Sequence, residues 1–287
     1  MGAIFRHELR NYFHSLTAYV FGAFLLAVIG IGAMFYNLEA AVSNFEFVLS
    51  FASIIFVVIV PILTMRTLAE ERRQRTDQLL YSLPITTTQV VLGKYLALLV
   101  VYLIPLAVIS LYPLLFSRFG DVYLPTSYGS LFAFFLMGAA LLAVGMFLSS
   151  LTDNQGFAAG IGVAAILLNY YSVSLAEYTS STAMGSLIAL YVIALLLGVV
   201  IRGLTRNENL AYGVAFALIA ALSVAYFVNS SAFEGLLPDI MTKLSLFRQF
   251  NSFVNGAFDL TAIVYYVSVM GFFLFLSVQS MEKRRYN

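Results

Sequence analysis

The side chains able to do chemistry are concentrated in one stretch, residues 70–95, which reads EERRQRTDQLLYSLPITTTQVVLGKY. It combines acids, arginines and a lysine, and it lies between two long apolar runs. Charges of both signs could pair with a partner protein. A phosphate-binding loop is excluded, because Lys94 is followed by Tyr95 and because Thr88, not a glycine, stands five residues before Gly93.

The rest of the chain offers little for catalysis or metal binding. His7 and His14 are the only histidines and do not form an H-E-x-x-H zinc motif. The absence of cysteine excludes disulfides, thiolate metal sites and cysteine nucleophiles. We therefore expect no enzyme activity, no catalytic residue, and no metal or cofactor in this chain. The net charge of +1 gives no sign of nucleic acid binding.

The charged stretch predicts a short amphipathic helix at the membrane surface. Thr76 or Asp77 could cap its start, and Pro84 disfavours a helical Leu83 and so ends it. Charges at the start followed by leucines suit docking in a groove of a partner. Anchoring to anionic lipid at the inner surface explains the arginines, but not the acids or the leucines.

Residues 3–16 predict a second surface element, a helix lying in the membrane interface. Arg6, Arg10 and His14 lie on one side of it. The opposite side is apolar and consists of Ile4, Phe5, Leu9, Tyr12, Phe13 and Leu16. The alternative is a plain cytosolic extension of the first membrane helix.

Composition places these elements on an integral membrane protein. The chain is 61% hydrophobic and only 10% charged, whereas soluble domains carry about 25% charged residues. Apolar runs without strand alternation predict an all-α, polytopic bundle of about eight transmembrane helices in a single domain, residues 1–287. The expected spans are residues 17–36, 47–65, 90–116, 129–151, 156–175, 184–201, 210–229 and 260–280.

The distribution of basic residues predicts the orientation. Three of them lie on one side of the expected spans, Arg118, Lys243 and Arg248, and the other twelve on the opposite side. The positive-inside rule then places both termini and the loop 66–89 in the cytoplasm and the longer loop 230–259 outside, where one or two surface helices are expected. A six-span arrangement without residues 184–229 keeps this orientation, because removing two spans preserves parity. The centres of the runs hold no ionisable residue, which argues against a proton-driven pump.

Three stretches resemble the ABC-2 type permeases of ATP-binding cassette transporters, nearest to the gliding-motility and nitrous-oxide-reductase-maturation branch. FRHELRNYFHSLTAYVFGAFLLAVIG resembles the opening of that family, and FNSFVNGAFDLTAIVYYVSVMGFFLFLSVQSMEKRR its closing stretch. The loop AEERRQRTDQLLYSLPITTTQVVLGKYLA resembles its hallmark cytoplasmic loop through Glu71, Thr76, Leu79, Leu80, Pro84, Ile85, Thr86, Leu92, Gly93 and Lys94. Arg75 departs from the usual glycine, and eight spans depart from the usual six.

The resemblance implies a multi-pass permease subunit in the plasma membrane, the inner membrane of a bacterium, that exports a substrate. It implies two cytosolic ATPase subunits, which bind ATP and Mg, and a second permease copy or paralogue in the same bilayer. Contacts with the ATPases are expected at Glu70, Glu71, Arg72, Thr76, Asp77, Leu79, Leu80 and Leu83, and from the interfacial helix at Phe5, Glu8 and Arg10. The alternatives are an ATPase-coupled scaffold that transmits force without transport, and a stand-alone secondary carrier.

Replacing both Leu79 and Leu80 with Asp is expected to abolish co-purification of the ATPase while membrane insertion stays intact, because charged side chains cannot enter an apolar groove without a large desolvation cost. Affinity purification of the tagged chain from solubilised membranes measures this. A variant complex that remains whole and active would contradict the docking hypothesis.

Overall fold

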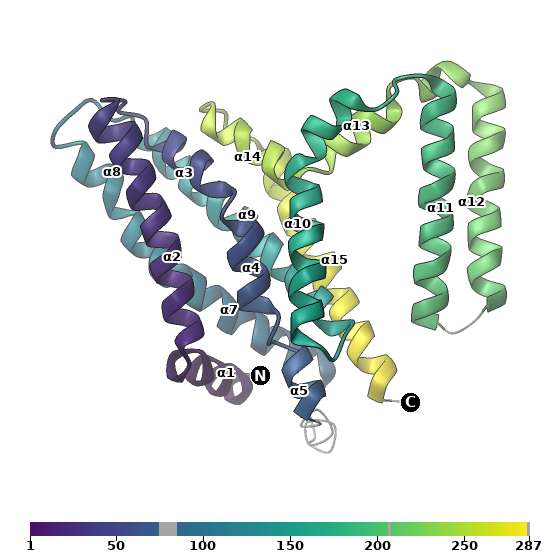
Figure 1. Ribbon diagram of the computed structural model, residues 1–287, viewed down its shortest axis with the longest axis horizontal. Coiled ribbons are helices and arrows are strands. Elements are labelled where there is room, and N and C mark those ends of the chain that lie inside the picture. Colours follow the sequence, from purple (N-terminus) through teal and green to yellow (C-terminus); the bar gives the residue numbers. More distant parts are fainter. Residues whose placement is uncertain (75–84, 206–207, 286–287) are drawn as a thin grey trace. The chain divides into compact units, whose positions relative to one another are not determined.

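The structure, a computed structural model, describes residues 1–74, 85–205 and 208–285, and every regular element in that part of the chain is helical (Figure 1). The predicted all-α polytopic helix bundle is confirmed. In chain order the elements are α1 (Gly2–His14), α2 (Leu16–Ala33), the π-helix η1 (Met34–Glu39), α3 (Phe45–Ser53), α4 (Phe56–Thr64), α5 (Ala69–Gln74), α7 (Thr87–Ile109), α8 (Leu111–Phe116), α9 (Leu124–Ser150), α10 (Gln155–Tyr178), α11 (Ala183–Thr205), α12 (Glu208–Val228), the 3₁₀-helix η2 (Ser230–Phe233), α13 (Leu236–Lys243), α14 (Leu246–Val254) and α15 (Leu260–Arg285).

Six helical segments of the described chain are long and apolar enough to cross a membrane: Leu16–Glu39, Thr87–Phe116, Leu124–Ser150, Gln155–Tyr178, Ala211–Val228 and Leu260–Lys283. The run 47–65 is broken, because Phe45–Ser53 and Phe56–Glu71 meet at a bend of 59°, and counted as one span this pair makes seven. The run 184–201 lies on α11, whose apolar part Ala183–Val199 is shorter than the others. All eight predicted runs are thus helical, while the count of eight spans stays a prediction.

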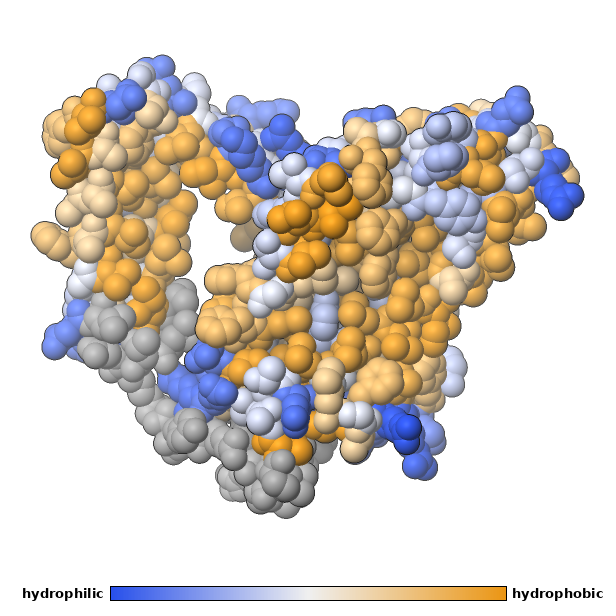
Figure 2. All heavy atoms as spheres, turned by 180° about the vertical axis from the view of Figure 1, so that it is seen from behind, coloured by the Kyte–Doolittle hydropathy of each residue, from blue (hydrophilic) through white to orange (hydrophobic). Residues whose placement is uncertain are grey.

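The surface agrees with a membrane environment. On the face seen in Figure 2, apolar side chains cover the long helices and polar side chains gather near their ends. Large apolar residues such as Phe24, Val58 and Phe272 are exposed on the surface. This exposure is unfavourable in water but favourable against the apolar chains of a lipid bilayer.

The chain forms two compact units, Met1–Tyr170 with Gln249–Asn287, and Tyr171–Arg248, which are described separately. In the first unit α9 is the central helix, and α3, α4, α7 and α15 all pack against it. Phe56 of α4 contacts the ring of Tyr102 on α7, with centroids 5.8 Å apart, and the ring of Phe134 on α9, with centroids 4.7 Å apart. The buried Tyr102 hydroxyl donates a 2.8 Å hydrogen bond to the carbonyl of Phe134, so this aromatic core leaves no phenol without a partner.

Two ends of this first unit can be defined by single residues. At the Lys94 end lie α1, α5, the start of α7 and the end of α15, with the N- and C-termini (Figure 1). At the Glu46 end lie the starts of α3 and α9 and the end of α14. Both termini at one end is the arrangement that the predicted topology requires, while the assignment of that end to the cytoplasm stays a prediction.

The N-terminal helix α1 is separate from α2 and does not extend it. Ser15 has an extended backbone between them, and its hydroxyl donates to the carbonyl of Tyr12. Leu16, which was expected on the apolar side of the interfacial helix, instead begins α2 and is largely exposed.

The second unit is a hairpin of α11 and α12 followed by η2 and α13. Gly198 and Ala215 allow the two helices to approach closely, since a Cβ at Gly198 would lie 3.0 Å from that of Ala215. The Tyr191 and Ser223 hydroxyls bond across the hairpin at 2.6 Å. Within residues 230–259, where one or two helices were expected, the chain forms α13 and α14.

The close approach of Tyr102 to Gly138 generates a stability prediction. A Cβ at Gly138 would lie 2.6 Å from two ring carbons of Tyr102, whereas one at Gly129, on the same helix α9, meets nothing within 4 Å. We expect Gly138→Ala to destabilise the protein by about 1–3 kcal/mol through overpacking. Gly129→Ala should be neutral or slightly stabilising. Thermal unfolding in detergent measures both, and equal melting temperatures would contradict the packing described.

Candidate coupling site

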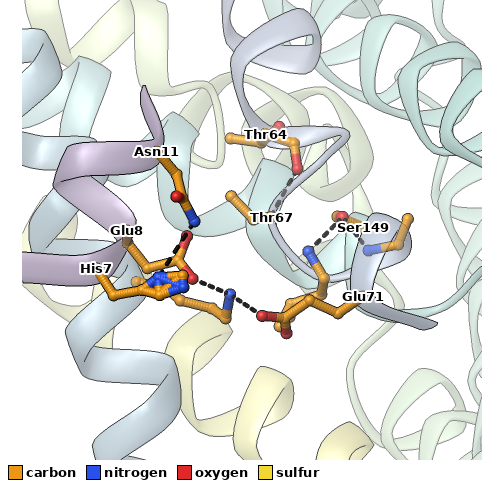
Figure 3. A network of polar contacts seen from close by, with 10 residues as sticks. His7, Glu8, Asn11, Thr64, Thr67, Glu71 and Ser149 are labelled. Carbon is orange, nitrogen blue, oxygen red and sulfur yellow. Dashed lines mark hydrogen bonds and ion pairs between the residues drawn. The ribbon is translucent and has the colours of Figure 1, made fainter. Parts of the chain in front are cut away.

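A buried lysine connects three separate elements at the Lys94 end. Lys94 lies near the start of α7, and its side chain is only 2% exposed. Its Nζ is 2.7 Å from Oε1 of Glu8 on α1 and 2.6 Å from Oε1 of Glu71 on α5 (Figure 3). We call Glu8, Lys94 and Glu71 the charge triad. It joins the N-terminal helix and the start of the charged loop to one membrane helix.

The sequence of α1 brings Glu8 to this position. Ile4, Glu8 and Tyr12 recur every four residues, so they share the face of α1 that packs on α7. Gly93 permits the approach, because a Cβ there would lie 3.1 Å from Cγ2 of Ile4. The dipeptide Gly93-Lys94 thus combines space for α1 with the charge that holds it.

Burial makes the triad sensitive to the loss of any member. Lys94 is desolvated and gains two charge-assisted hydrogen bonds in return. Removing one partner of a buried ion pair costs about 3–5 kcal/mol, because the remaining charge is left without compensation. Without Lys94 two carboxylates would face each other at the base of α7.

Tyr12 adds no charge to this environment. Its side chain is buried, and burial first, then the negative charges of Glu8, Glu71 and Glu70, raise the pKa of the phenol well above its usual value, against a smaller lowering by Arg66. The phenol therefore stays protonated at neutral pH and packs as a neutral group beside the triad.

The start of the charged loop is also held by α9. The Ser149 hydroxyl accepts hydrogen bonds from the backbone amides of Leu68 and Ala69, at 3.3 and 3.2 Å, and donates to the carbonyl of Met65 (Figure 3). In the same turn, the Thr67 hydroxyl donates to the carbonyl of Thr64 at 2.7 Å. These bonds give partners to backbone amides and carbonyls between α4 and α5, where no regular helix provides them.

The far end of the loop is fixed by a different helix. The Thr86 hydroxyl accepts from the amide of Gln89 and so caps α7. The neighbouring Thr87 hydroxyl donates a 2.8 Å bond to Glu282 on α15. The segment between α5 and α7 is therefore tethered at one end to α1, α7 and α9, and at the other to α15.

The structure unites some of the predicted contact residues and does not describe others. Glu8 and Glu71 meet at Lys94, so their carboxylates point into the protein. Glu70 and Arg72 lie on α5, Phe5 is half-buried on α1, and Arg10 is exposed there. The remaining predicted contacts lie outside the described residues: Thr76, Asp77, Leu79, Leu80 and Leu83.

Sequence reasoning named Lys94 only as part of the loop resemblance, without a contact, and assigned no role to Ser149 or Glu282. A signal for Lys94 was available, because a lysine followed by the apolar run YLALLVVY is costly unless it is paired. Nothing comparable marks Ser149, since serine is common in membrane helices and bonds locally. The Glu282 contact joins residues 195 positions apart, which no local pattern reveals.

One comparison with known families matches the middle of the chain. Residues 37–176 match a family model described as ABC-2 family transporter protein. No curated protein matches the chain. The ABC-2 match covers just under half of the chain, from η1 to α10, and includes the charged loop and Lys94. It supports an ABC-2 type permease and a role in membrane transport, whereas α1 and α15, which supply Glu8 and Glu282, lie outside the matched range.

The triad predicts a characteristic pattern of stability. Lys94→Met should lower stability by about 3 kcal/mol, the low end for a buried pair, because two carboxylates that are only 15% and 22% exposed lose their counter-charge. The triple variant K94M/E8Q/E71Q removes all three charges together and should recover much of that loss. Thermal unfolding of the purified protein measures both.

The matched control is Lys243→Met, which removes an exposed lysine that pairs with Asp239 on the same helix. Its effect should not exceed about 1 kcal/mol. If K94M and K243M are equally stable, or if the triple variant is no better than K94M, the charge triad is not what holds α1 and α5 to α7.

Proposed function

We propose that this chain is the membrane-spanning permease subunit of an ATP-binding cassette transporter, driven by separate ATPase subunits. The observation that carries the proposal is the charge triad, which connects the matched ABC-2 loop to a membrane helix through buried ion pairs. Apolar helices long enough to span a bilayer support the membrane location. No catalytic role is proposed for this chain.

The coupling step follows from the anchors of the loop. A displacement of α5 by a docked ATPase would act on Lys94 through Glu71, and Lys94 also holds α1 through Glu8. Stretching buried ion pairs is costly, so α1, α5 and the start of α7 would move as one body. Rigid-body movement of packed helices is the established way in which such local displacements become large changes elsewhere.

The assembly belongs to the proposal as well. Two cytosolic ATPases would bind ATP and Mg and dock on residues 70–83, and a second permease copy or paralogue would complete the path. The location would be the plasma membrane, a bacterial inner membrane, with both termini in the cytoplasm and transport outward. The sequence resemblance favours the gliding-motility and nitrous-oxide-reductase-maturation branch.

The test is the ATPase activity of the isolated complex in lipid nanodiscs. An ATPase subunit should co-purify with the tagged chain, and the K94M/E8Q/E71Q variant should keep that subunit while its hydrolysis rate falls roughly tenfold. The reason is that the neutral triad can pack but no longer transmits displacement through charge-assisted bonds. K243M serves as the control and should hydrolyse ATP at the unmodified rate.

Two results would replace the proposal by one of its rivals. Solute movement by the purified chain alone in liposomes, with no ATPase bound in native membranes, would indicate a secondary carrier. A complex that hydrolyses ATP but moves no candidate solute would indicate a scaffold that transmits force. Unchanged hydrolysis in the triad variant would contradict the coupling step itself.

A further inference from the structure

A buried carboxylate lies at the opposite end of the same unit. Glu46, in the first turn of α3, is 3% exposed. Its Oε1 accepts a 2.6 Å hydrogen bond from the Asn44 amide, and its Oε2 accepts a 3.2 Å bond from the hydroxyl of Ser127 on α9. None of the ion pairs found among the described residues includes Glu46. A buried acid whose donors in the described chain are all neutral is unusual.

Two helix N-termini make this charge tolerable. Glu46 lies in the first turn of α3, and Ser127 lies in the first turn of α9. The N-terminus of a helix carries partial positive charge, which stabilises a nearby carboxylate. The Asn44 bond and the N-terminus of α3 belong to the same segment as Glu46 and stay with it. The Ser127 bond and the N-terminus of α9 stabilise Glu46 only while the two helix ends are together, so this part of the stabilisation holds α3 to α9.

The helix that carries Glu46 ends in a bend. Between α3 and α4, Ile54 and Ile55 form 3₁₀-type bonds, from the amide of Ile55 to Ala52 and from that of Val57 to Ile54. The two helices meet there at 59°. A 3₁₀ turn inside a long apolar helix has weaker bonds than an α-helix and often marks a hinge.

The two sides of this bend are held differently. On the α4 side, Thr64 packs against Gly145 of α9, and the following turn is bonded to Ser149. On the α3 side, the bond from Ser127 to Glu46 is the polar contact between α9 and α3 in the described chain. Phe45 of α3 also stacks on Tyr112 of α8. In the described chain α3 thus has one polar attachment to α9, beside its apolar packing on α2 and α9, whereas the turn after α4 has two backbone amides bonded to Ser149.

We propose that α3 is a gate that turns about Ile54 and Ile55 and that the Glu46–Ser127 bond is its latch. Glu46 is then a positioning residue that keeps the path closed at this end until α4 and α5 are displaced from the Lys94 end. This inference rests on the proposed function for its trigger, but the latch can be tested without ATP.

The absence of cysteine in the chain permits a direct test. Val48 on α3 is completely buried, so Val48→Cys reports opening through its reaction with a water-soluble maleimide. The complex in nanodiscs exposes both faces to the reagent. Without nucleotide, adding E46A should raise the labelling rate at least tenfold, because a charged hydrogen bond is lost.

Two further variants make the result specific. E46Q retains an oxygen that can accept from Ser127 and a similar volume, so its labelling rate should lie between those of E46A and the unmodified residue. E39A removes an exposed acid just before α3 and should leave labelling unchanged. Equal rates for E46A and E39A would overturn the latch.

ATP separates this inference from the proposed function. Turnover should raise labelling of V48C in the chain with Glu46 intact. If E46A opens the site but ATP does not, the latch stands and the proposed ATP coupling fails. If ATP opens the site while E46A has no effect, the latch is overturned and the coupling stands.

A disulfide provides a second measurement that does not touch Glu46. A Cβ built at Gly32 of α2 would lie 3.0 Å from Cγ1 of Val48, the position a cysteine sulfur would take. The G32C/V48C pair is therefore close enough to bridge. Oxidation should stop ATP-driven transport and reduction should restore it. Transport that continues with the bridge formed would overturn the movement of α3.

Discussion

The central constraint in this protein is the pairing of one buried lysine with two acids. Lys94 cannot be left without a counter-charge in an apolar environment, so it fixes where Glu8 and Glu71 must lie. Because those acids come from α1 and α5, a local electrostatic requirement determines the position of the N-terminal helix and the beginning of the charged loop. Gly93 makes the arrangement sterically possible. The start of the charged loop, α5, is thus joined to the membrane helix α7 through Glu71.

The helix α9 provides the frame against which this arrangement could act. It holds the α4–α5 turn through Ser149 at one end and the start of α3 through Ser127 at the other. The broken pair α3–α4 runs along it with a bend between the two attachments. A displacement of α5 at the charge triad would therefore act between α9, which is continuous, and the pair α3–α4, which is bent. This difference in stiffness is the physical basis for proposing movement at the Glu46 end.

Much of this architecture could be predicted from sequence, and what could not has physical reasons. Long apolar runs identify membrane helices because the bilayer demands satisfied backbone groups. The bend at Ile54 and Ile55 could not be predicted, since both residues are apolar and the Ser53 before them, which bonds to the carbonyl of Ser50, is of a type common in membrane helices. Glu8 and Glu71 were expected to contact a partner because the family resemblance implies that the interfacial helix and the charged loop meet an ATPase. Their inward orientation depends on Lys94, 86 and 23 residues away, and only the fold brings these side chains together.

The distance between α1 and α5 tests the central claim most directly. Spin labels at His7→Cys and Arg73→Cys, both exposed positions in a chain without native cysteine, report this distance by pulsed electron resonance. With Lys94 present, we expect one narrow distribution of distances that keeps its width when nucleotide is added. With K94M, the distribution should broaden. A broad distribution with Lys94 present, or one that K94M leaves unchanged, would contradict the claim that the triad joins these elements into one body.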